Sequence, residues 1–338
     1  MHRFLPPLLV ATIILSIHPI YHVVVGMLGV PHTHTNSKTR APHMMPFYKK
    51  YEACVAPFHA SFQDMTKCPF VKKQHPMHTS NKIALILTIR GNWPAHMMLW
   101  LHRALQNTYI DFHIFYDTFT TRTQQRERYS ISPNIYIHVG FSDRLRTVRN
   151  ALGFPDINET NAWWVLCDLR PFNGMIYEKM LHDYEYWGWT DTDVIYGNLS
   201  SFYSYNQLRH YDVVGTGMGD RTSGPLSFFK NKPFITHHAP MKLPRHKYIR
   251  HEWSGLDESF QHVLGDARLN VSYKNTEASG ASTSRRYYKN GRIFEDGDEK
   301  SYYHWGGRSQ DQKKIFLNSF KQQCKKDCFP ATFRFIQQ

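Results

Sequence analysis

Residues 184–199 of the chain read YEYWGWTDTDVIYGNL. An aromatic run of β-favouring composition leads into two carboxylates, Asp191 and Asp193, and a Gly-Asn turn signal follows the next apolar segment. The pattern predicts a buried strand with two acidic residues at its C-terminal end. In an extended backbone residues i and i+2 point the same way, so we expect the two carboxylates on one face, about 6.6 Å apart along the chain.

The two carboxylates predict a cation site. Asp191 and Asp193 would repel each other at this spacing unless a cation lay between them. Hard oxygen ligands of this kind suit Mg²⁺, Mn²⁺ or Ca²⁺, with waters and substrate phosphates completing the coordination shell. Asp-x-Asp also occurs by chance in solvated loops. Here the apolar neighbours on both sides make unpaired acids costly to place, which favours the cation.

With other blocks, this segment resembles a known family. Residues 187–199 are similar to the Asp-x-Asp region of glycosyltransferases with the GT-A fold, and most closely to a glycosyltransferase-like group with a WGYxDxDxxFGN pattern. The other similar blocks are residues 83–94 (IALILTIRGNWP, its first strand and loop), 166–171 (LCDLRP, its CDxKP block), 223–231 (SGPLSFFKN, its SGxxxxxRN block), Asp257-Glu258 and Tyr303-His304. The resemblance spans residues 82–316.

The apolar periodicity between these blocks alternates between strand and helix. Met97, Leu101 and Leu105 recur at helical spacing after a continuous apolar run of strand length. Strands are predicted at residues 83–89, 112–116, 134–139 and 212–215, and helical spacing at residues 172–182. The order predicts an α/β fold with ligands at the carboxyl ends of parallel strands. The resemblance implies a GT-A-like (Rossmann-like) mixed, mostly parallel sheet flanked by helices.

The N-terminal segment predicts a secreted or anchored chain. Residues 4–37 contain no Asp, Glu, Lys or Arg, and the apolar span is long enough for a membrane helix of about 20 residues. Prolines and histidines interrupt it, so an uncleaved signal anchor (transmembrane helix) over residues 1–30, a cleaved signal peptide and a buried soluble helix all remain open. The first two carry a lumenal stem over residues 31–80 and a GT-A-like catalytic domain over residues 81–338 into the secretory pathway.

Composition limits the classes of partner. Charged residues make up 20% of the 338 residues and aromatic residues 15%, as in a globular protein. The net charge of +14 favours polyanions, but the N-terminal segment argues against nucleic acid. We therefore expect a Golgi membrane protein, single-pass type II, with a lumenal catalytic domain. The alternative is a non-catalytic lumenal polyanion- or glycan-binding protein on a transferase scaffold.

The resemblance also assigns roles to residues. It implies transfer of a sugar from a nucleotide-sugar donor, expected to be UDP-linked, to a glycan or glycoconjugate acceptor, with Mn²⁺ (or Mg²⁺) as cofactor. The implied metal ligands are Asp191, Asp193 and His304. The implied catalytic residues are Asp191, Asp193, Asp257 and Glu258. The implied donor contacts are Thr88, Gly91, Asp117, Asp168, Arg170 and Arg308.

Plain structural roles remain open for the same residues. Asp117 fits a turn, and His304 fits a packed core position among aromatic residues. Asp168 and Arg170 would also pair with each other, and Arg170 stands where the family pattern has lysine. Its planar fork suits a phosphate or a carboxylate. Asp257 and Glu258 would equally suit the first turn of a helix, where acids favour the helix dipole, and Trp-Gly-Gly after His304 departs from the family pattern.

Overall fold

The computed structural model describes residues 72–73, 81–90, 97–117, 127–139, 169–216, 224–244, 256–265, 267–274, 277–278, 286–289 and 292–304. Residues 1–30, where the anchor is predicted, lie outside this part of the chain, as do Gly91, Asp168 and Arg308. Among the helices in the described ranges, none is both long and apolar enough to cross a membrane.

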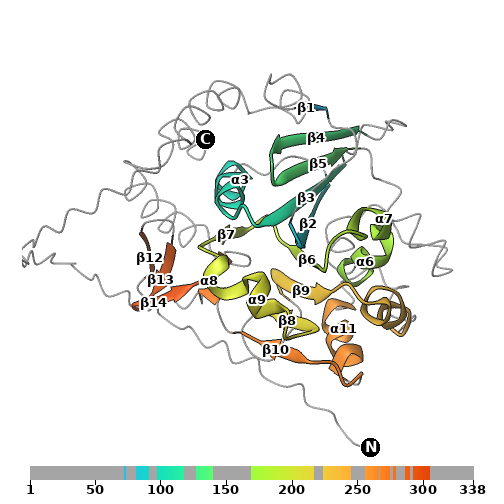
Figure 1. The fold of residues 1–338 in the computed structure, drawn as a ribbon. Helices are drawn as coiled ribbons and strands as arrows, with labels where there is room; N and C mark the ends of the chain where they lie inside the picture. Colours follow the sequence, from blue (N-terminus) through green and yellow to red (C-terminus); the bar gives the residue numbers. More distant parts are fainter. Residues whose placement is uncertain are drawn as a thin grey trace, which may run out of the picture. The chain divides into compact units, whose positions relative to one another are not determined.

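The described residues form a nine-stranded sheet with the order β1-β4-β5-β3-β2-β6-β9-β8-β10 (Figure 1). Its strands are β1 (Lys72–Lys73), β2 (Ile83–Arg90), β3 (Ile110–Asp117), β4 (Glu127–Ser132), β5 (Ile135–Val139), β6 (Tyr186–Thr190), β8 (Val213–Gly215), β9 (Leu226–Lys230) and β10 (Val271–Tyr273). Within this sheet β4 and β9 run against the other strands. The predicted mixed, mostly parallel sheet is therefore confirmed.

Two smaller sheets contain the remaining described strands. The first has the order β11-β15-β7, from Glu277–Ala278, Tyr302–His304 and Val194–Tyr196. The second is antiparallel and consists of β12 (Arg286–Lys289), β13 (Arg292–Glu295) and β14 (Asp298–Lys300). Residues 277–300 thus supply strands to both small sheets.

The helices flank the large sheet. They are α3 (Met97–Gln106), the 3-10 helix η2 (Arg170–Phe172), α6 (Asn173–Ile176), α7 (Glu178–Leu181), α8 (Ser200–Tyr203), α9 (Tyr205–Leu208), the π-helix η3 (Phe234–His238), α10 (Ala239–Met241) and α11 (Leu256–Gly265). The predicted stripe of α3 is confirmed, since Met97, Leu101 and Leu105 are buried. The helical spacing over residues 172–182 is broken, because Tyr177 leaves helical geometry at φ −109° and ψ 18°.

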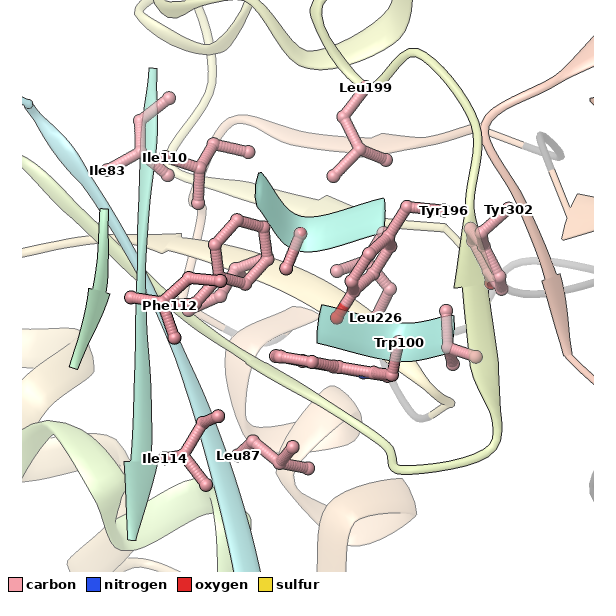
Figure 2. Close-up of a cluster of buried hydrophobic side chains, with 14 of the residues drawn as sticks. Ile83, Leu87, Trp100, Ile110, Phe112, Ile114, Tyr196, Leu199, Leu226 and Tyr302 are labelled. Atoms are coloured by element: carbon pink, nitrogen blue, oxygen red, sulfur yellow. The ribbon is translucent and has the colours of Figure 1, made fainter. Parts of the chain in front are cut away.

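Alternate residues of β2 face two different cores. Leu85 and Leu87 join a cluster with α3, α8 and α9, part of which is shown in Figure 2. Ala84 and Ile86 join a second cluster with α7 and α11. A strand covered on both faces is apolar at every position, which explains why residues 83–89 form a continuous apolar run.

Strand β6 lies in the middle of the sheet, and its glycine allows a close approach to β9. Trp187 and Trp189 are fully buried and pack against Phe229 of β9, with ring centroids 4.8 and 4.5 Å apart. Between them, a Cβ atom at Gly188 would lie 2.1 Å from the backbone oxygen of Ser227. Position 188 therefore accepts glycine alone while the two strands are paired.

The variant Gly188→Ala is expected to lower the free energy of unfolding by at least about 3 kcal/mol, the upper end of the usual cost of overpacking. The clash is with backbone, which cannot move without breaking the β6–β9 ladder. Gly265→Ala is the matched control: its added Cβ meets nothing within 4 Å at the end of α11, so stability is expected to hold or rise slightly. Urea unfolding followed by circular dichroism compares the two, and equal stability would contradict the close approach.

Candidate metal centre

The two acids of the central motif lie where the chain passes from one sheet to another. Asp191 directly follows β6 of the large sheet, and Asp193 directly precedes β7 of the small sheet. Residues 192–193 form a turn, so the prediction of an extended Asp-x-Asp was wrong. The physical reason is the change of sheet, because β7 leaves β6 to pair with β15. Both acids lie at the carboxyl edge of the parallel strands, where ligands gather in α/β folds.

A third side chain joins the two acids. Asp191, Asp193 and His304 each offer one ligand atom, and these three atoms lie within 4.8 Å of one another. The pairing of β15 with β7 places His304 opposite Val194, which brings His304 Nε2 to 3.4 Å from Asp193 Oδ1. All three residues are half-buried. Within the described ranges no other group of three or more His, Cys, Asp or Glu side chains converges in this way.

The chemistry of this group fits a divalent cation. Carboxylate oxygens suit Mg²⁺ and Mn²⁺, and an imidazole nitrogen is accepted by transition metals. Burial raises the pKa of Asp191, Arg170 opposes this rise, and the neighbouring Asp193 carboxylate adds to it. The charged form of Asp191 is thus disfavoured by desolvation and by a like charge. A bound divalent cation would offset both effects.

Arg170 connects the metal turn, which we define as residues 191–193, to a third acid, Asp257. Its guanidinium donates to the Asp191 carboxylate and to the carbonyl oxygen of Gly224, 3.3 Å away. Its Nη1 also lies 3.9 Å from Oδ2 of Asp257, in the first turn of α11. Three elements that are distant in sequence therefore meet at one guanidinium. The planar fork faces carboxylates here, which is one of the two partners that the sequence indicated.

Asp257 and Glu258 differ in their surroundings. Asp257 is buried, and its Oδ1 accepts the backbone N–H of Glu258 at 3.0 Å. Its other oxygen faces Arg170, so Asp257 belongs to the same polar group as Asp191. Glu258 is half-buried on the first turn of α11. Both acids thus occupy the first turn of a helix, and Asp257 is connected to the metal centre as well.

The expected donor contacts are placed only in part. Thr88 is half-buried in β2, near the carboxyl end of the strand. Asp117 is the last residue of β3 and pairs with Arg90 at the end of β2, so it reaches the same edge of the sheet; its side chain lies outside the described part. Gly91, Asp168 and Arg308 also lie outside it. The donor-contact assignments of Thr88, Asp117, Arg170 and these three residues remain predictions.

Trp100 of α3 contacts the site, a role that the sequence analysis did not assign to it. Its indole Nε1–H donates to the backbone oxygen of Asp191 at 3.0 Å. A buried tryptophan normally finds a partner for its N–H, so the residue type itself was a signal. The partner lies 91 positions away in the chain, which local patterns do not show.

Fold and site together define a mixed α/β protein with an Asp-Asp-His centre at the carboxyl edge of its sheet. The chain belongs to a family of unknown function, DUF6625, which matches residues 85–326. No curated protein sequence matches it.

Several solved glycosyltransferase structures are similar to this chain at low identity. The galactosyltransferase LgtC, in complex with donor and acceptor sugar analogues, is 14% identical over 74% of this chain and 99% of that chain, with a TM-score of 0.40. The catalytic domain of Drosophila β1,4-galactosyltransferase 7, in complex with xylobiose, is 13% identical over 76% of this chain and 79% of that chain, with a TM-score of 0.34.

The variant Arg170→Gln is expected to lower the free energy of unfolding by about 3 kcal/mol, because it leaves two mostly buried carboxylates without their shared cation. The loss is expected to grow with pH. Without Arg170 the folded-state pKa of Asp191 rises further above its unfolded value of about 3.9. Such a carboxyl group costs stability progressively as the pH rises above the unfolded pKa.

Urea unfolding at about pH 5 and about pH 7.5 measures this dependence. The matched control is Lys82→Gln, which breaks the ion pair with Glu185 between side chains that are 52% and 43% exposed. An exposed pair contributes at most about 1 kcal/mol. Equal losses in the two variants would contradict a special role for Arg170 in holding the acids.

Proposed function

We propose that this chain is a metal-dependent glycosyltransferase with a GT-A-like fold. It would move a sugar from a nucleotide-sugar donor, UDP-linked as the first candidate, to a glycan, glycoprotein or glycolipid acceptor. The observation that carries the proposal is the convergence of Asp191, Asp193 and His304 within 4.8 Å at the carboxyl edge of the sheet. The sequence resemblance over residues 82–316 supports the same chemistry.

The proposed reaction breaks the bond between the anomeric carbon of the sugar and a diphosphate oxygen, and it forms a bond to an acceptor hydroxyl. When bound, Mn²⁺ or Mg²⁺ supplies neutralisation of the charge that grows on the departing nucleoside diphosphate. Asp191, Asp193 and His304 would hold the cation. Arg170 would fix the Asp191 carboxylate, since it donates to that carboxylate.

The remaining residues take positions around this centre. We assign Asp257 or Glu258 to the acceptor side, as a binder of the acceptor hydroxyl or as its general base. Asp257 suits this role because one of its oxygens lies 3.9 Å from Arg170, beside the metal turn. We assign the donor side to Thr88, Gly91, Asp117, Asp168, Arg170 and Arg308.

We further propose that the activity resides in the Golgi membrane, as a single-pass type II protein with a lumenal catalytic domain. The support is the apolar, charge-free composition of residues 4–37. A second candidate function is a non-catalytic lumenal polyanion- or glycan-binding protein. The net charge of +14 favours it.

The full-length chain with Mn²⁺ is expected to release one nucleoside diphosphate from a panel of nucleotide sugars. Asp193→Asn is expected to reduce this release at least about hundredfold, because charge neutralisation by a metal contributes several kcal/mol to the barrier. A chelator should have the same effect on the wild type. Asp183→Asn is the matched control, since Asp183 is an aspartate whose side chain is 77% exposed, and it should retain the wild-type rate.

The outcome separates the two candidate functions. If no nucleotide sugar of the panel releases its nucleoside diphosphate, and no Mn²⁺-dependent nucleotide binding is found, the transferase proposal is overturned. Binding to a polyanion such as heparin that tolerates Asp193→Asn and weakens steeply with salt would then support the second candidate.

A further inference from the structure

The turn that carries the metal acids is not fixed by pairing between its own flanking strands. In the described structure β6 pairs with β2 and β9, whereas β7 pairs with β15. A hairpin would hold such a turn through ladder hydrogen bonds between its two arms. Here other contacts must set the direction of the two carboxylates.

The backbone of Asp191 is held from two sides. Its N–H donates to the backbone oxygen of Pro225 at 3.1 Å, which continues the pairing of β6 with β9. Its carbonyl oxygen accepts the indole N–H of Trp100 at 3.0 Å. The plane of the peptide group between residues 191 and 192 is therefore fixed by a side chain of α3.

Trp100 also contacts the second arm of the turn. It is fully buried, and its ring meets Tyr196 of β7 edge-on at a centroid distance of 5.4 Å. Figure 2 shows the two rings next to each other, with the hydroxyl end of Tyr196 directed towards Trp100. That hydroxyl lies 2.6 Å from Oγ1 of Thr190, the last residue of β6. Trp100 and Tyr196 thus join the two arms across the turn.

The same face of α3 continues this contact along the chain. Arg103 Nε donates to the backbone oxygen of Tyr196 at 2.6 Å. Asn107 donates to the backbone oxygen of Gly197 at 3.2 Å and accepts the N–H of Leu199 at 2.9 Å. Positions 100 and 103 lie on one side of α3, and Asn107 directly follows the last residue of the helix, Gln106. Polar groups of α3 and of the residue after it therefore follow the segment that begins at Asp191.

We propose that Trp100, together with Tyr196, acts as a positioning residue for the metal centre. The indole N–H fixes the Asp191 carbonyl, and the Tyr196 hydroxyl fixes Thr190; together they set the direction in which Asp191 and Asp193 present their oxygens. Neither side chain belongs to the group of three that would hold the cation. The inference rests on the proposed function, because it requires that the three ligands bind a metal.

Trp100→Phe in the full-length chain tests the inference, because it removes the N–H and keeps an aromatic ring. The dissociation constant for Mn²⁺, measured from the electron paramagnetic resonance signal of free Mn²⁺, is expected to rise about fivefold, as for one lost hydrogen bond. Tyr196→Phe removes the hydroxyl bonded to Thr190 and is expected to act in the same direction. It also decides the matter should Trp100→Phe not fold.

Trp187→Phe is the matched control. Trp187 is also fully buried, but its indole N–H has no hydrogen-bond partner within the described structure, and its ring packs against Phe229. Both tryptophan variants should lower the urea midpoint, since both lose buried volume. The Mn²⁺ affinity should change in Trp100→Phe and stay at the wild-type value in Trp187→Phe.

The possible results separate the two proposals. No Mn²⁺ binding by the wild type would overturn both the proposed function and the positioning role. Wild-type binding that is unchanged in the Trp100 and Tyr196 variants would overturn the positioning role alone, as would equal weakening in the Trp187 control. Selective weakening in the Trp100 and Tyr196 variants would support it.

Discussion

The repulsion between Asp191 and Asp193 is the constraint on which this structure depends. Burial and the neighbouring Asp193 carboxylate both raise the pKa of Asp191 and so disfavour its charged form. Basic side chains from distant segments lie next to the two acids. Arg170 donates to Asp191, and His304 lies 3.4 Å from Asp193. The sheet order, the short helix η2 and the small sheet all serve to bring these partners to one turn.

The same constraint explains why the acids sit where strands separate. Along β6 every residue is buried, so a carboxylate within the strand would be desolvated without room for ligands or water. The acids begin one residue beyond the strand, at the edge where β2 and β3 also end. Gly188 is packed tightly against the backbone of β9, whereas Asp191, three residues later, is only half-buried.

Much of the fold followed from sequence because its signals are local. The continuous apolar run of residues 83–89 and the spacing of Met97, Leu101 and Leu105 predicted β2 and α3. Strand β4 was missed, since four of the six residues in its sequence ERYSIS are polar. The break at Tyr177 was missed because helical spacing does not report one residue's dihedral angles. For the site, Asp191 and Asp193 came from a local motif.

The other members of the site came from elsewhere. His304 and Asp257 were indicated by resemblance, and no periodicity points to either. The partners of Arg170 and Trp100 were not predictable, because the contacts join residues 21 and 91 positions apart. Pairings of that range are decided by how strands and helices pack, which the sequence pattern does not contain.

The location of His304 on a separate small sheet has a consequence for how the molecule is assembled. The two acids follow the large sheet, whereas the histidine arrives with one of the last described strands, paired to β7. A cation bound by all three would link the two sheets, and its binding free energy would add to the free energy of docking β15. A chain that ends before β15 would keep the strands of the large sheet and lose this link. Metal occupancy would therefore report whether β15 is paired with β7.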